Sequence, residues 1–201
     1  MTTMTTINEV KNHLHIHQPG KLALLSPSET LHMIFDVEKA LAGFKEYDYD
    51  LIEASCMAVA ELRYDSVHEG PKDTMELYGM VARLGYGPMM FLVAMQKSEE
   101  LSGGMVPHTS PHYVTDAASK MIESFYSGAN TVYTMGYEYE GRHSKDHLNF
   151  VYQSASHVDL STMEENLMGV LQYSDGTYME YMWEAGESWL TNAMRDIYHV
   201  T

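Results

Sequence analysis

This chain has little cysteine and no long apolar run. Cys56 is the one cysteine among 201 residues, so no internal disulfide forms and the fold owes nothing to an oxidising compartment. It lies in an apolar stretch and is interpreted as a small buried hydrophobe rather than a reactive thiol. The longest unbroken apolar run, residues 89–95, is far shorter than the ~20 residues that cross a bilayer. With no basic segment leading into an apolar one at the N-terminus, we expect a soluble protein without a secretory signal or membrane contact.

Positive charge is also scarce. Lys and Arg total 12 against 28 Asp and Glu, which gives a formal net charge of −16. A protein that tracks nucleic-acid phosphates normally carries a basic face, so we expect no direct nucleic-acid binding. Basic proteins and cationic ligands stay open as partners. The acidic run over residues 47–50 is interpreted as a solvated face, with imitation of a nucleic-acid ligand as the alternative.

Apolar residues, methionine and tyrosine are plentiful. The apolar fraction of 45% is enough for a hydrophobic core in a chain whose length suits one domain. The 17 methionines and 15 tyrosines suit adaptable contact surfaces, because Met fills irregular gaps and Tyr combines a buried ring with a polar tip. Drift in the composition of a viral genome is an equally good explanation.

The spacing of apolar residues predicts an α/β (α+β) domain. Ser26, Pro27 and Glu29 form a capping-box pattern that predicts a helix over residues 27–42. Residues 51–64 fit a strand better than a helix, although the helix stays open. Further strands are expected at 10–17, 21–25 and 74–81, further helices at 89–100, 115–126, 161–173 and 178–198, and a β-hairpin at 131–140 and 148–154. The expected architecture is a mixed central sheet flanked by helices, in which residues 1–128 form the core and residues 129–201 add a hairpin and two helices to the same domain.

A glycine-rich turn, Gly85-Tyr86-Gly87-Pro88, separates a predicted strand from a predicted helix. Backbone N–H groups in such a turn, together with the positive end of the helix dipole, bind phosphate without any lysine. This suits a chain with few basic residues. A single Gly-x-Gly is also an ordinary turn, and that alternative stays open from the residues alone.

The region from Met75 to Tyr126 resembles the acyl-CoA-binding core of the GNAT superfamily of N-acyltransferases, and more closely the divergent GNAT-like proteins of tailed bacteriophages. The shared features are a strand, the Gly-Tyr-Gly-Pro turn, a helix rich in Met and Leu, a Gly-Gly-apolar step at residues 103–105, and a Val-Thr-x-Ala-Ala helix that ends in aromatics. The sequence departs from the family pattern at Ala82, where the loop usually opens with Arg or Gln. The resemblance covers about a quarter of the chain.

The resemblance implies a GNAT-like fold and an N-acyltransferase that moves an acetyl group from acetyl-CoA to an unknown amine. The backbone of the turn and first helical residues would hold the CoA pyrophosphate. These positions are Leu84, Gly85, Tyr86, Gly87, Pro88, Met89 and Met90. Glu76 would act as general base for the amine, and Tyr126 would protonate the departing thiolate.

The same fold also suits a protein without catalysis. The alternative is a virion, neck or assembly component of a phage, or an acidic inhibitor of a host protein, with contacts through a Met- and Tyr-rich surface. Either function places the protein in the cytoplasm of the host cell or in the virion.

Two histidine patterns are candidate metal ligands. His13, His15 and His17 alternate on a predicted strand and share one face, as zinc ligands or the histidines of a histidine-triad hydrolase would. A half-exposed strand is the favoured interpretation. His143 and His147 have helical ligand spacing but lie at a predicted hairpin tip, so a solvated loop is favoured there. No metal is expected.

Overall fold

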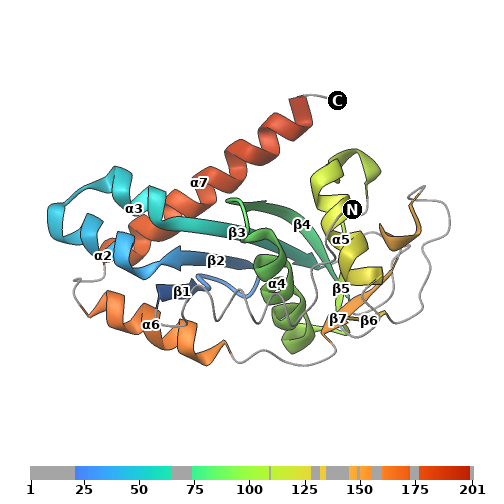
Figure 1. Cartoon of the computed structure of the whole chain (residues 1–201), viewed down its shortest axis with the longest axis horizontal. Helices are drawn as coiled ribbons and strands as arrows, with labels where there is room; N and C mark the ends of the chain where they lie inside the picture. The colour runs from blue at the N-terminus through green and yellow to red at the C-terminus, as the bar shows by residue number, and fades with distance from the viewer. Residues whose placement is uncertain are drawn as a thin grey trace.

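The computed structural model describes residues 21–64, 74–108, 110–127, 132–134, 145–148, 150–154, 160–172 and 177–199. Within these ranges the protein is a mixed α/β fold around a seven-stranded sheet of order β1-β2-β3-β4-β5-β7-β6 (Figure 1). The strands are β1 (Leu22–Leu25), β2 (Leu31–Asp36), β3 (Cys56–Tyr64), β4 (Met75–Ala82), β5 (Met105–Val106), β6 (Val132–Thr134) and β7 (Tyr152–Ser154). The α-helices are α2 (Val37–Glu46), α3 (Tyr49–Ser55), α4 (Gly87–Leu101), α5 (Asp116–Ser127), α6 (Ser161–Leu171) and α7 (Thr177–His199), with short 3-10 turns η2 (Pro111–Tyr113) and η3 (Asp146–Leu148).

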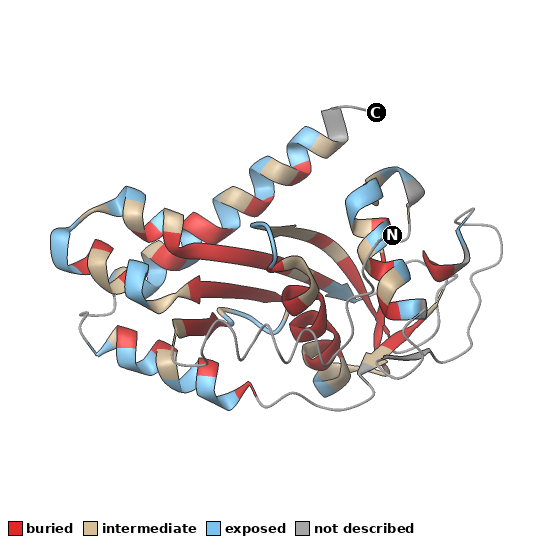
Figure 2. Ribbon diagram, in the orientation of Figure 1, coloured by how far each residue is buried: buried red, intermediate tan, exposed pale blue. Residues whose placement is uncertain are grey.

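The sheet has a hydrophobic core on each face. Helix α4 crosses one face, and α7 runs along the other from α2 and α3 toward the C-terminus (Figure 1). Alternate residues of β3 serve the two cores, so that Ala58 and Ala60 face α4 whereas Val59 faces α7. Central strands buried on both faces are mostly red in Figure 2. The sheet is therefore the middle of three layers.

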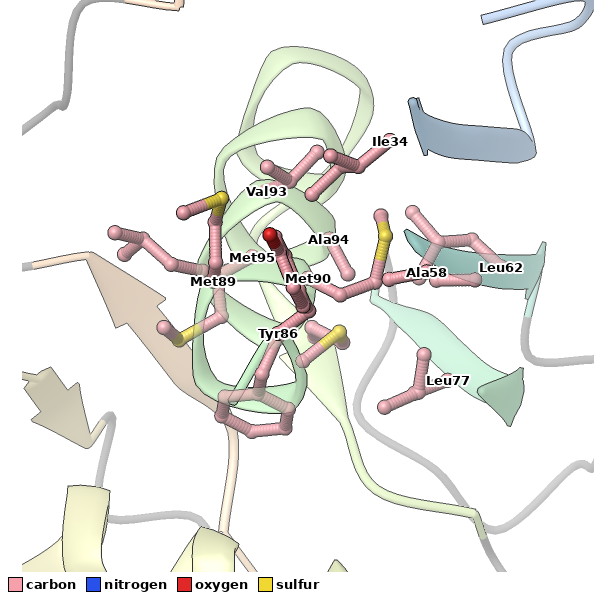
Figure 3. Packing of buried hydrophobic residues seen from close by; sticks show 14 of the residues in the cluster. Ile34, Ala58, Leu62, Leu77, Tyr86, Met89, Met90, Val93, Ala94 and Met95 are labelled. Carbon is pink, nitrogen blue, oxygen red and sulfur yellow. The ribbon is translucent and has the colours of Figure 1, made fainter. Parts of the chain in front are cut away.

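Helix α4 is almost entirely buried along its first three turns. Figure 3 shows its side chains against those of β2, β3 and β4; the labelled neighbours are Ile34, Ala58, Leu62 and Leu77. The helix carries residues of the predicted phosphate turn at its N-terminus. Its burial fixes where that N-terminus lies relative to the sheet.

The predicted helix over residues 27–42 is wrong in its first half. Residues 31–36 are strand β2, paired antiparallel with both β1 and β3. Ser28 Oγ accepts from the amide of Leu31 at 3.1 Å, so this segment makes a turn into β2 instead of capping a helix. The helix begins after Asp36, whose carboxylate accepts from the amide of Lys39 at 3.0 Å. Burial on both faces of the sheet outweighs the local capping pattern.

Residues 51–64 form the end of a short helix followed by a strand. Helix α3 ends at Ser55, and β3 begins at the next residue, Cys56. The strand interpretation is confirmed for residues 56–64 and wrong for residues 51–55. Asp48 starts α3 by accepting from the amides of Asp50 and Leu51.

The other predicted helices are confirmed, with bounds within a few residues. Helix α6 starts at Ser161, and Leu160 before it supplies no side-chain cap. The predicted hairpin pairing is confirmed where β6 meets β7, but the second strand begins at Tyr152 instead of residue 148. The expected strand at 10–17 and residues 141–144 of the hairpin tip lie outside the described residues, whereas η3 occupies the end of the tip.

Candidate functional site: a cleft beside the glycine turn

The candidate site begins where two parallel strands separate. β4 and β5 pair through only two positions, Met75 with Met105 and Glu76 with Val106. β4 also has an irregular register against β3, because Leu62 pairs with Leu77 whereas Glu61 pairs with Gly79. Tyr78 is therefore the extra residue of a β-bulge. Bulges bend a strand and are frequent next to active sites.

A cleft of about 60 Å³ opens beside this bulge. It lies between β4, the segment that follows β5, α5 and the last turns of α7. Its polar groups are contributed by Tyr78, His108, Tyr113 and Thr115, and the rest of its lining is apolar. A cleft of this volume has room for a few water molecules.

The glycine turn is open at Gly85. This residue has a φ of +91° and a Cβ built on it would meet nothing within 4 Å. Gly87, at the start of α4, lies against α5, since its Cβ would be 3.4 Å from the Met121 sulfur. Met121 also lines the cleft. The turn and the cleft are therefore joined through α5.

Some of the backbone amides of the turn are used within the turn itself. Tyr86 donates to the Arg83 carbonyl and Met90 donates to the Tyr86 carbonyl, both at 3.0 Å, and Pro88 has no N–H. The amides of four residues donate no hydrogen bond within the described part of the chain. They belong to Leu84, Gly85, Gly87 and Met89. The side chains of Tyr86, Met89 and Met90 are buried in the core, whereas the side chain of Leu84 is fully exposed beside these amides.

Arg83 does not bring its charge to the turn. Its Nε donates to the Cys56 carbonyl at 2.8 Å, and its guanidinium lies 5.2 Å from the Trp189 ring of α7. Both contacts place the guanidinium on the α7 face of the sheet. Cys56 itself is buried, as expected, and burial raises the pKa of its thiol to about 12.

Glu76 and His108 lie next to each other beside the cleft, and His108 Nδ1 accepts a hydrogen bond from the Ser110 amide at 3.0 Å. The Glu76 Oε1 atom is 3.4 Å from His108 Nδ1, and both side chains are 10% exposed. The His108 ring lines the cleft and packs against Tyr78 and Tyr113 at centroid distances of 5.4 and 4.9 Å. The sequence predicts a role for Glu76 but assigns none to His108. The two residues come together only because β4 and β5 pair in the folded chain.

Tyr126, the predicted proton donor, lies away from the cleft lining. It is on the last turn of α5, 39% exposed, with its ring 5.1 Å from that of Phe150. α5 presents Ala118, Met121 and Ile122 to the cleft. The structure therefore does not bring Tyr126 together with Glu76, and its role stays a prediction.

The remaining predicted sites lie mostly outside the described residues. These are His13, His15, His17 and His143. The solvated loop predicted at His147 is wrong, because this histidine is buried and shares a hydrogen bond of 2.9 Å with Ser119. The described part of the chain contains no group of three metal-ligating side chains. None of its helices has the length and apolarity needed to span a bilayer.

No family model, curated protein or solved structure matches this chain.

Proposed function

We propose that this protein is a GNAT-like N-acyltransferase of the phage type, which transfers an acetyl group from acetyl-CoA to an amine. The observation that carries the proposal is the glycine turn at the start of α4, with four amides that donate no hydrogen bond within the described residues. Amides at a helix N-terminus bind phosphate oxygens well. The cleft beside the β4 bulge then receives the acyl end of the same ligand, because Met121 borders both features.

The reaction needs a proton acceptor and a proton donor. The amine nitrogen attacks the thioester carbonyl, a C–N bond forms and the C–S bond breaks, so that the amine loses a proton and the thiolate gains one. Glu76 is the proposed acceptor, with His108 beside it in the cleft wall. Tyr126 is the donor implied by the resemblance, whereas Tyr78 and Tyr113 are the tyrosines that line the cleft.

Binding of acetyl-CoA is tested by thermal unfolding. A ligand at 100 times its Kd stabilises the native state by about 2.7 kcal/mol, which raises the Tm of a chain of this size by roughly 5–10 °C. We expect this rise with acetyl-CoA and a much smaller one with acetyl-pantetheine, which lacks the pyrophosphate. Gly85→Glu should abolish it, because a carboxylate would stand where the phosphate binds.

The control for this variant is Gly85→Gln. Both side chains impose the same strain at a positive φ, and only one carries charge. A Gln variant that keeps more of the Tm rise than the Glu variant supports the anion site. A Tm that acetyl-CoA leaves unchanged contradicts the proposal, as does an equal rise in the Glu variant. Glu76→Gln should keep the Tm rise while transfer to an amine is lost.

A non-catalytic assembly or inhibitor protein is the second candidate. It is favoured by large apolar side chains that are exposed on helices and turns: Tyr47, Tyr49, Met168, Met179 and Trp183. Such side chains are typical of protein interfaces. Stoichiometric recovery of the protein in purified particles, measured by mass spectrometry, together with an unchanged Tm in acetyl-CoA, would favour this function.

A further inference from the structure

A second hollow lies at the end of the sheet where α2, α3 and the start of α7 meet. Its volume is about 530 Å³, within the range of ligand-binding pockets. The lining residues are Leu41, Phe44, Lys45, Tyr47, Tyr49, Thr177 and Tyr178. We call it the aromatic groove. It shares no lining residue with the cleft beside β4.

Two rings of this groove are exposed, and two ring contacts join the groove to α7. Tyr47 is 74% exposed and Tyr49 is 51% exposed. The Tyr49 ring packs in a tilted arrangement against Tyr181 of α7, and Phe44 of α2 packs in the same way against Tyr178, each at a centroid distance of 4.4 Å. Ring faces held in this way offer contact area at little cost in side-chain entropy.

The charge around the aromatic groove favours a cation. Residues 45–53 contain four carboxylates, those of Glu46, Asp48, Asp50 and Glu53, against one ammonium group, that of Lys45. The hydroxyl of Tyr181, the packing partner of Tyr49, donates to Glu53 Oε1 at 3.5 Å. A carboxylate therefore lies next to an exposed ring pair. Lys45 lines the groove and opposes a cation, which makes it a useful site for a test.

We propose that the aromatic groove binds a basic segment of a partner polypeptide, with a lysine or arginine side chain over the ring of Tyr47 or Tyr49. Ammonium and guanidinium groups are attracted to tyrosine faces, and nearby carboxylates strengthen that attraction. The groove exceeds the volume of a single ammonium group, which suits several residues of an extended peptide. The net charge of −16 attracts basic partners at long range. This binding site does not depend on acyl transfer at the cleft.

The test is an NMR titration of the whole chain with the peptide acetyl-Gly-Lys-Gly-Arg-Gly-Lys-Gly-amide, and with a matched peptide that carries Glu at the basic positions. We expect the basic peptide to shift the resonances of groove residues and the acidic peptide to leave them unchanged. Tyr49→Leu should weaken binding about fivefold, as loss of one cation–π contact does. Lys45→Gln should tighten binding about twofold, because one opposing charge is removed.

The matched control is Tyr64→Leu, which removes another exposed tyrosine ring, 57% exposed at the end of β3. It should bind the peptide as the wild type does. Equal weakening by Tyr49→Leu and Tyr64→Leu would overturn the proposal, since diffuse attraction to an acidic surface would then explain binding. Absence of groove shifts up to about 5 mM peptide would also overturn it. So would stronger binding of the acidic peptide.

Discussion

We expect His32 to make the stability of the folded chain fall as the pH drops below 6.5. The side chain is 2% exposed on β2. Its pKa is lowered from 6.5 to about 4, first by burial and next by the charge of Lys97, while a backbone hydrogen bond at Glu29 partly offsets both. The unfolded chain therefore takes up this proton at a higher pH than the folded chain does. Acidification from pH 6.5 toward 4 consequently favours unfolding.

The size of the effect follows from the difference between the two pKa values. A lowering from 6.5 to about 4 corresponds to a loss of about 3 kcal/mol once the pH is below both values. Between pH 7 and pH 5 the loss from His32 is about 2 kcal/mol. Above pH 7 the histidine is neutral in both states and contributes no pH dependence. A loss of 2 kcal/mol is a large part of the 5–15 kcal/mol that is typical of a folded domain.

Urea unfolding at pH 7 and pH 5 measures this loss in the wild type and in His32→Asn. Asparagine keeps a polar atom near the position of Nδ1, which lies 2.9 Å from Ser26 Oγ, but does not titrate. The free energy of unfolding should fall by about 2 kcal/mol less in the variant than in the wild type. His112→Asn, at an exposed histidine, should leave the wild-type difference in place. The reasoning is refuted if His32→Asn loses as much stability as the wild type over the same pH interval.

Three further substitutions test the packing of helix glycines and the cap of α2. Gly186→Ala should destabilise the protein by about 1–3 kcal/mol, because its Cβ would lie 2.5 Å from the sulfur of fully buried Met33. Gly169→Ala, which places its methyl group in open space on α6, should instead stabilise the protein by about 0.5–1 kcal/mol. Equal urea midpoints for these two variants would contradict the close contact between Gly186 and Met33. Asp36→Ala should cost about 1 kcal/mol by removing the cap from the Lys39 amide, which the same measurement detects; an unchanged midpoint would exclude that cap as a source of stability.

Local sequence determined the helix and turn whose boundaries depend on a few neighbouring residues. Helix α4 follows its glycine turn with Pro88 in the first turn, where a missing N–H costs nothing. Gly85 adopts the positive φ that glycine tolerates. The backbone part of the candidate phosphate site could therefore be predicted from the sequence alone.

Tertiary pairing decided the places where local patterns were ambiguous or misleading. Residues 31–36 become a strand because β1 and β3 flank them and both sheet faces need apolar side chains, although the preceding Ser-Pro pattern favours a helix. Arg83 adjoins the turn in sequence, yet its guanidinium is held on the opposite face of the sheet by the Cys56 carbonyl and Trp189. Neither outcome is encoded in neighbouring residues.

The side-chain part of the candidate site was likewise decided by the fold. Glu76 and His108 meet because β4 and β5 pair in parallel, and Tyr78 borders the cleft because β4 carries a bulge there. The aromatic groove forms where α7 returns to α2 and α3, which brings Tyr178 to Phe44. Composition alone gave the acidic charge and the abundance of tyrosine. Long-range contacts brought these side chains together, because strand pairing and helix packing depend on the whole sheet and not on any local segment.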